Sequence, residues 1–303
     1  MNFKFWTGLI IGLGMGVVAS APHIRATKVD EENNKIVHSL PQIIEAVDLD
    51  QQFSFAGEVL PNNFDNIERL DREMLVNAYW QSSTLLNIKA ANRFFPVIEK
   101  ILAEQNVPDD FKYLAVAESN LRNVTSSAKA KGFWQFRKLA AKEFKLEVND
   151  EVDERFHVEK ATRAACKYLK QLHKRFGNWT NAAAAYNVGP TNFKRILKNQ
   201  GQTSFYDLNL NPETSRYVFR LIAIKQIMSN PSHFGFYLDE SKKYAPLDNY
   251  YEVVVDKSIP SWSQFAKEHG ISYRILKVYN PWLRDTKLTV INNTYKVKIP
   301  RNS

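Results

Sequence analysis

The chain has 303 residues, a formal net charge of +9 and a hydrophobic fraction of 44%, which suits one large folded domain with a smaller one. The positive charge favours an anionic partner, but the basic residues are scattered and no nucleic-acid-binding motif is present, so we predict no nucleic-acid partner. A single cysteine, Cys166, excludes an intramolecular disulfide. The six histidines lack metal-ligand spacing, so no metal site and no cofactor are predicted.

Residues 1–26 are typical of an export signal or an N-terminal membrane anchor. Lys4 precedes an apolar stretch from Phe5 to Ala21. The end of this stretch resembles a cleavage site, but Pro22 directly after it would hinder cleavage, so an uncleaved anchor remains an alternative. Either interpretation places the protein outside the cytoplasm, in the periplasm or elsewhere in the cell envelope.

Residues 27–62 form a polar and acidic lead-in segment. Three of its apolar side chains are expected to lay part of it against the main domain; they are Phe53, Phe55 and Leu60. From Phe64 to about Asn106, apolar residues recur at steps of three and four, which predicts two helices. Pro108 and the two acidic residues after it predict the start of a third helix.

Further helices are predicted over Arg137–Phe144 and over Val158–Phe176, where Gly177 ends the second. Between them, the acidic segment Glu147–Glu154 is interpreted as a solvated loop. Cys166 falls on the apolar face of helix 158–176, which indicates a buried structural thiol.

Two helix starts are predicted near the end of the helical region. Thr180 is the expected cap of a short helix that ends at Gly189-Pro190, and Asn211-Pro212 opens a long helix to about Met228. Strand-like alternation is absent from 64 to 230, so we predict a mainly α fold with a helical domain over 63–231.

The residue pattern changes from helical to strand-like after a linker at 232–249. Tyr250–Asp256 is rich in β-branched and aromatic residues and predicts a strand. A helix ending at Gly270, a second helix over Ile271–Tyr279 and a strand over Tyr295–Ile299 are expected to follow. Residues 250–303 therefore predict a small βααβ domain.

Glu118 is the only charged residue between Leu114 and Ser119. Such a carboxyl group is either a helix-end acid turned to solvent or a general acid whose pKa is raised by desolvation and by the negative end of its helix. A small-residue loop and then Gly132–Phe136 follow it.

Four short motifs occur in order along the middle of the chain: Glu118-Ser119, Gly132–Phe136, Ala185–Asn187 and Glu213–Val218. Together they resemble the catalytic core of lysozyme-like lytic transglycosylases, the soluble lytic transglycosylase and membrane-bound transglycosylase D group. The C-terminal βααβ pattern resembles a degenerate LysM module, in which Asp256-Lys257-Ser258 replaces the usual Gly-Asp-Thr turn. Glycan binding by this module and a role as a spacer are both left open.

The resemblance implies a peptidoglycan substrate and Glu118 as the catalytic acid and then base. The bond between N-acetylmuramic acid and N-acetylglucosamine would be cleaved with formation of a 1,6-anhydro ring. The implied substrate-binding residues are Ser119, Gly132, Phe133, Gln135, Tyr186, Asn187 and Tyr217. Phe133 and Trp134 are expected to form an apolar wall beside Glu118, with one of the two in the core, and Glu213 is expected to be an N-terminal helix charge.

Two other functions remain open from the sequence. One is a lysozyme-type hydrolase on the same scaffold, in which water replaces the sugar hydroxyl as the attacking group. The other is a non-catalytic wall-binding protein, in which the LysM-like module anchors an inactive domain.

Overall fold

The computed structural model describes residues 28–30, 35–37 and 45–301. The chain divides into two compact units, Met1–Ala46 and Val47–Ser303. The first unit contains the antiparallel strands β1 (Lys28–Asp30) and β2 (Lys35–Val37). The predicted export signal or anchor at 1–26 lies outside the described residues. Across the described ranges, no helix is both long and apolar enough to cross a membrane.

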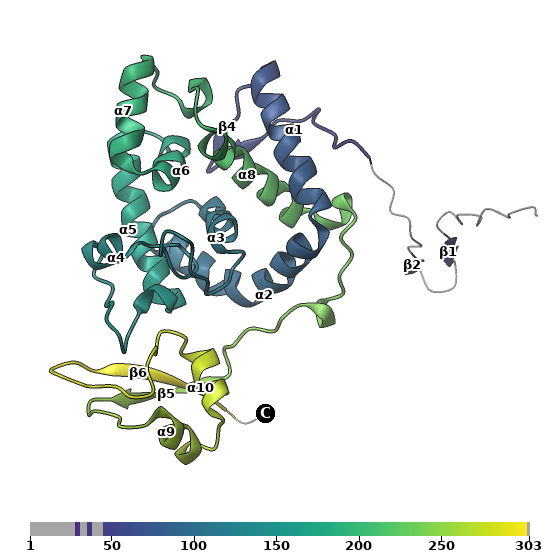
Figure 1. The fold of residues 1–303 in the computed structure, drawn as a ribbon. Coiled ribbons are helices and arrows are strands. Elements are labelled where there is room, and N and C mark those ends of the chain that lie inside the picture. The colour runs from purple at the N-terminus through teal and green to yellow at the C-terminus, as the bar shows by residue number, and fades with distance from the viewer. Residues whose placement is uncertain (1–27, 31–34, 38–44, 302–303) are drawn as a thin grey trace, which may run out of the picture. The chain divides into compact units, whose positions relative to one another are not determined.

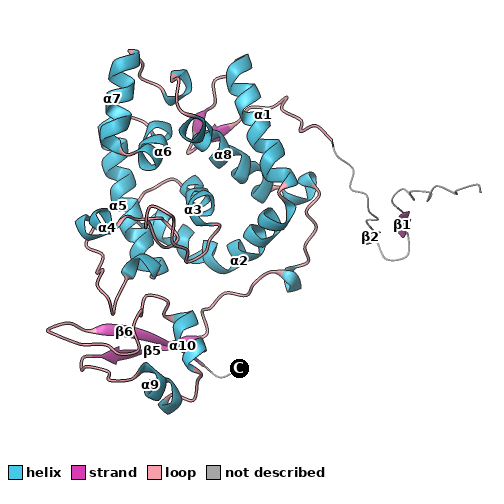
Figure 2. Ribbon diagram, in the orientation of Figure 1, coloured by secondary structure: helices cyan, strands magenta, loops and turns pink. Residues whose placement is uncertain are grey.

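The first part of the second unit is helical (Figures 1 and 2). Its α-helices are α1 (Phe64–Tyr79), α2 (Gln81–Glu104), α3 (Lys112–Ser119), α4 (Lys138–Glu143), α5 (Val158–Phe176), α6 (Trp179–Val188), α7 (Pro190–Gln200) and α8 (Pro212–Ser229). Helix α1 packs on α8, α5 packs on α6, and α3 contacts both α2 and α8. This arrangement confirms the predicted mainly α fold.

Helix α3 is the short central element of this helical part (Figure 1). Leu114, Ala115 and Val116 are completely buried in the main hydrophobic core. Since eight residues form a marginal helix in water, tertiary packing has to stabilise α3. The burial therefore fixes the end of α3, where Glu118 lies.

Part of the lead-in segment belongs to the same core. Strands β3 (Ser54–Phe55) and β4 (Glu58–Val59) form a tight hairpin. The predicted packing of this segment on the helices is confirmed, because Phe53, Phe55 and Leu60 are buried with them. Glu58 also accepts backbone N–H bonds from Trp179 and Thr180, at 2.6 and 2.8 Å, at the positive end of α6.

Near α6, one predicted helix cap is wrong and one helix was not predicted. Asn178, and not Thr180, caps α6, because its side chain accepts the backbone N–H of Asn181 over 2.7 Å. The predicted end of α6 at Gly189-Pro190 is confirmed, with Gly189 as the C-cap, but Pro190 also begins α7, a helix that the sequence did not predict. Proline suits the first helical position, where its missing N–H group would have no intrahelical partner.

The C-terminal module has the predicted strand–helix–helix–strand order. Strands β5 (Tyr250–Val255) and β6 (Tyr295–Pro300) pair antiparallel, and α9 (Trp262–Glu268) and α10 (Tyr273–Tyr279) lie between them in sequence. Its core contains Trp262, Leu276 and Val297. Val152 and Phe156 from the helical part complete this core, so the module packs against the segment that precedes α5.

Candidate active site

Glu118 lies on the last turn of α3 and, unlike the core residues before it, keeps partial exposure to solvent. Directly after Ser119, the backbone of Asn120 and of Leu121 adopts a left-handed φ of 52°. Asparagine tolerates this conformation, whereas for leucine it costs about 1–2 kcal/mol. Backbone strain of this kind concentrates at functional sites, and here it lies three residues from the carboxyl group.

The surroundings of Glu118 favour its protonated form. Burial raises the pKa of the carboxyl group to about 7. The hydrogen bond from Tyr217 and the charge of Arg220 lower this pKa, while the charge of Glu213 raises it. A carboxyl group with a pKa near neutrality can donate a proton and then take one back, which is what general acid–base catalysis requires.

Two tyrosines, the buried Tyr217 and the half-buried Tyr186, hold the parts of the site together. Tyr217 on α8 donates its hydroxyl hydrogen to Oε1 of Glu118 over 2.5 Å. Tyr186 on α6 donates its own to the carbonyl oxygen of Trp134 over 2.6 Å. Burial raises the pKa of each well above the usual value for tyrosine, so both hydroxyl groups keep their protons. Tyr217 thus orients the carboxyl group of Glu118. Tyr186 anchors the loop between α3 and α4, which spans residues 120–137.

Gly132 allows the closest backbone approach in the site. Its φ is +77°, and a Cβ atom there would lie 1.8 Å from the carbonyl oxygen of Arg155. The conformation and the contact both require glycine. Ser119 ties the same loop to α3, since its hydroxyl oxygen lies 2.9 Å from the carbonyl oxygens of Ala115 and Phe133. Ser119 therefore acts at the end of the helix and on the loop.

Phe133 and Trp134 both belong to the core, whereas the sequence suggested that one of them would. Phe133 is 2% exposed, and its ring packs edge-on against Phe94 with the centroids 4.7 Å apart. Trp134 is fully buried and donates its indole N–H to Thr162 over 2.9 Å. The two side chains therefore anchor the loop, and their carbonyl groups accept the bonds from Ser119 and Tyr186.

Gln135 and Asn187 are the half-buried amides of the site. Gln135 has a left-handed φ of 47°, and its side chain donates to the carbonyl oxygen of Gly132 over 2.7 Å. The amide of Asn187, next to Tyr186 on α6, has no hydrogen-bond partner within the part of the chain that the structure describes. The side chain of Asn187 is thus available to bind a ligand. Gln135 uses its amide N–H to stabilise its own loop, and its amide oxygen is available to a ligand.

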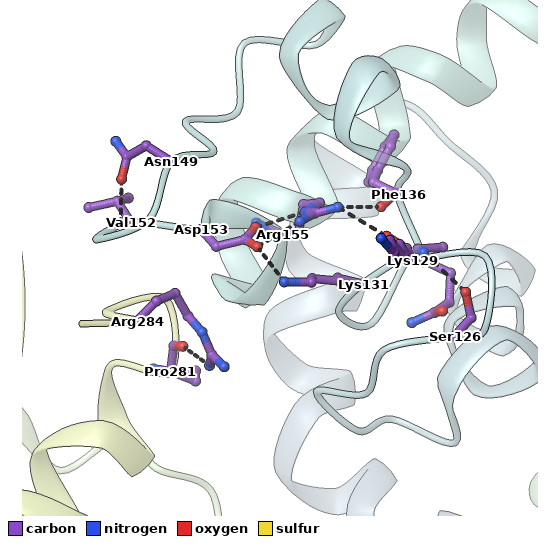
Figure 3. A network of polar contacts seen from close by, with 12 residues as sticks. Ser126, Lys129, Lys131, Phe136, Asn149, Val152, Asp153, Arg155, Pro281 and Arg284 are labelled. Carbon is purple, nitrogen blue, oxygen red and sulfur yellow. Dashed lines mark hydrogen bonds and ion pairs between the residues drawn. The ribbon is translucent and has the colours of Figure 1, made fainter.

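A buried ion pair braces the loop from the other side (Figure 3). The guanidinium group of Arg155 donates to both carboxylate oxygens of Asp153, at 2.8 and 2.7 Å. Its remaining nitrogen, Nη1, donates to the carbonyl oxygens of Phe136 and Lys129, at 3.2 and 3.4 Å. Arg155 therefore holds the loop between α3 and α4 at two points, Lys129 and Phe136. Its own carbonyl group packs closely against Gly132.

The interpretation of Glu147–Glu154 as a solvated loop is wrong for its buried residues, which include Val148 and Val152 as well as its last two residues. Asp153 and Glu154 are 2% and 5% exposed. Arg155 pairs with the first of them and Lys160 with the second, so their charges are buried with partners. The same segment meets the C-terminal module, where the backbone N–H of Asp153 donates to the carbonyl oxygen of Trp282 over 2.9 Å.

Sequence reasoning missed Asp153, Arg155 and Arg220, and it undervalued Glu213. The Asp-x-Arg spacing of the first two was the available signal, because a two-residue step can bring a carboxylate and a guanidinium group together. Nothing in the sequence indicated that Arg220 and Glu213 act on a carboxyl group about a hundred positions earlier. The buried thiol of Cys166 is confirmed, and burial raises its pKa to about 12.

Glu118→Gln is expected to stabilise the protein more at alkaline pH than at acidic pH. The carboxyl group has a pKa of about 7 in the folded state against a reference value of 4.5, so folding takes up a proton between these values. The free energy of unfolding therefore falls as the pH rises through this window and stays low above it. Calorimetry should show a gain of about 1–3 kcal/mol near pH 8 and much less near pH 4. An equal gain at both pH values would contradict the raised pKa.

The fold and site together define a helical, lysozyme-like domain with one acid at its centre, followed by a small LysM-like module. Residues 95–209 match the family model of the transglycosylase SLT domain. Residues 251–303 match that of the soluble lytic transglycosylase C-terminal LysM-like domain. The chain is thus similar to SLT transglycosylase domains in its helical part and to a LysM-like domain after it.

The chain is homologous to membrane-bound lytic murein transglycosylase D. It is 29% identical over 263 residues to that protein of Escherichia coli (strain K12), covering 82% of this chain and 55% of the relative. The protein of Escherichia coli O6:H1 gives the same values. A putative tributyltin chloride resistance protein of Alteromonas sp. (strain M-1) is 32% identical over 123 residues, covering 40% of this chain and 59% of the relative. The chain spans a little over half the length of these relatives.

Proposed function

We propose that the protein is a peptidoglycan lytic transglycosylase that cleaves the β-1,4 bond between N-acetylmuramic acid and N-acetylglucosamine and leaves 1,6-anhydro ends. The observation that carries this proposal is a single carboxyl group of raised pKa, Glu118, oriented by a buried tyrosine. The SLT domain and the homology to a lytic murein transglycosylase support the same reaction class.

In the proposed reaction, protonated Glu118 gives its proton to the glycosidic oxygen as the bond to C1 of the muramoyl sugar breaks. The substrate's acetamido group stabilises the positive charge that develops at C1. The Glu118 carboxylate then takes the proton of the muramoyl C6 hydroxyl while that oxygen attacks C1. The carboxyl group is regenerated and no water is consumed, so one acid suffices where ordinary glycoside hydrolysis uses two.

The remaining residues would bind and orient the sugar. The free amide of Asn187 and the amide oxygen of Gln135 are the proposed partners of the substrate's acetamido and hydroxyl groups. Tyr217 fixes the carboxyl group of Glu118. Ser119, Gly132, Phe133 and Tyr186 shape the loop that carries Gln135, so that the substrate meets a preorganised surface.

The proposed location is the cell envelope. The apolar segment within 1–26 suits export or attachment to a membrane, and the two Escherichia coli relatives are named as membrane-bound. The net charge of +9 suits an anionic wall polymer. We further propose the division into a lead-in segment at 27–62, a catalytic domain at 63–231, a linker at 232–249 and a LysM-like module at 250–303.

Mass spectrometry of the muropeptides released from purified peptidoglycan tests this function. Anhydro products, lighter by one water than reducing ends, are expected from the wild type and not from Glu118→Gln. Reducing ends that disappear in the variant would identify a lysozyme-type hydrolase. Release of equal amounts by both, or of none by the wild type, would contradict the assignment and favour the wall-binding alternative.

Tyr217→Phe is expected to move the alkaline limb of the pH–activity profile upward. The hydrogen bond from Tyr217 lowers the pKa of Glu118, so its loss raises that pKa, and the acid stays protonated to higher pH. The maximal rate should fall at the same time, because the carboxyl group loses the donor that orients it. The profile of kcat/KM between about pH 5 and pH 9 checks this, and a limb that stays in place or moves down would contradict it.

A further inference from the structure

Glu73 on α1 is a completely buried carboxylate. Three guanidinium groups surround it. Arg216 on α8 pairs with its Oε1 atom, Arg72 lies 3.1 Å from the same atom, and Arg220 on α8 lies 3.3 Å from Oε2. A buried charge is expensive unless it is paired, so this cluster fixes two arginines of α8 against α1.

The same stretch of α8 serves the candidate acid. Tyr217, which donates to Glu118, lies directly after Arg216 and one turn before Arg220. Arg220 donates to Glu73 over 3.3 Å, and from its place one turn after Tyr217 its positive charge also lowers the pKa of Glu118. The negative charge of Glu73 partly offsets the positive charge of Arg220. The electrostatic effect of Arg220 on the pKa of Glu118 is therefore weaker than that of an unpaired arginine.

We propose that Glu73 is a positioning residue that, through Arg220, sets the acid strength of Glu118. This inference rests on the proposed function only for its consequence in catalysis. In the ion pair with Glu73, the positive charge of Arg220 is held toward α1 and partly neutralised. Burial raises the pKa of Glu118, and the pair with Glu73 limits how far Arg220 lowers it again.

The other charged groups around Glu118 do not provide this link. Tyr217 and Glu213 act on Glu118 from α8, and Tyr186 on α6 is itself affected by the charge of Glu118. At the opposite end of α3, Glu99 and Asp109 are paired with Lys112. Asp110, just before α3, is paired with Lys225 of α8.

A titration of the Glu118 carboxyl group by carbon-13 NMR tests the proposal, with the Glu118 signal assigned by its absence in Glu118→Gln. Glu73→Gln keeps the shape of the side chain and removes its charge, so Arg220 acts more strongly on the acid. The titration midpoint of Glu118 is expected to fall by roughly half a unit to one unit. The alkaline limb of the activity profile is expected to move down by the same amount, which a purely structural role would not cause.

Arg216→Gln is the control, since it removes a partner that lies closer to Glu73 than Arg220 does and leaves the Arg220 pair in place. Its midpoint is expected to stay within a few tenths of the wild-type value. If Glu73→Gln does not fold, Glu73→Asp, which retracts the carboxylate by one methylene, should lower the midpoint by a smaller amount. A midpoint that stays in place or rises in the Glu73 variant that folds overturns the proposal. The titration does not depend on enzymatic activity, so the two proposals can fail separately. If only the proposed function is wrong, the midpoint of Glu118 still shifts in the Glu73 variant, but the wild type releases no muropeptides.

Discussion

Replacing Glu118 by glutamine is expected to reduce the release of muropeptides from peptidoglycan by about 10²–10⁴-fold. Glutamine has nearly the same shape and can still accept the hydrogen bond from Tyr217, but it can neither give a proton to the glycosidic oxygen nor take one from the sugar hydroxyl. The rate of release from purified peptidoglycan, measured at the wild-type optimum, checks this result.

Glu143→Gln is the control for this substitution. Glu143 is the next acidic residue along the chain and is exposed at the end of α4. Its replacement should leave the rate within about twofold of the wild type, because surface substitutions of this kind perturb the structure little. A Glu118→Gln protein that folds and retains wild-type activity would show that another group supplies the proton.

Gly132→Ala is expected to be the most damaging of the small substitutions. The added methyl group would lie 1.8 Å from the carbonyl oxygen of Arg155, on a backbone with a φ of +77°. Overpacking of this kind costs about 1–3 kcal/mol, and the left-handed conformation adds about 1 kcal/mol. To relieve the overlap, the loop that carries Gln135 must move, and a displacement of about 1 Å at a site can reduce activity by 10²-fold.

Gly177→Ala separates the two causes. Gly177 ends α5 with a φ of +85°, but a Cβ atom there meets no atom within 4 Å. This variant should lose only the stability that the backbone conformation costs and keep its activity. Thermal unfolding and muropeptide release, measured side by side, distinguish the two variants. Equal behaviour of both would show that contact with Arg155 does not position the loop.

The sequence singled out Glu118 as the candidate acid because a single charge within an apolar helical segment is conspicuous. Glu118 and Tyr217 are indeed joined by a hydrogen bond, although nearly a hundred residues separate them. Helix starts were predictable where a local cap determines them, as Asn211 does for α8. The start of α7 was missed because Pro190 serves both as a stop signal after one helix and as the first residue of the next.

What the sequence did not reveal depends on partners that only the fold brings together. In the sequence, Asp153 resembles a surface acid. In the fold, Arg155 and the C-terminal module cover it. The sequence did not single out Glu73 in its amphipathic helix, since two of the three arginines that pair with it are more than 140 positions away. The burial of a charge is decided by such contacts, and no local pattern of residues records them.

Digestion of purified peptidoglycan in water enriched in the heavy oxygen isotope tests the central claim most directly. If the C6 hydroxyl of the sugar attacks C1, the released muropeptides should be anhydro forms that carry no heavy oxygen. A lysozyme digest run in the same water is the positive control and should incorporate one heavy oxygen at each new reducing end. Incorporation of the isotope at C1 of products released by this protein would contradict the account and make it a hydrolase.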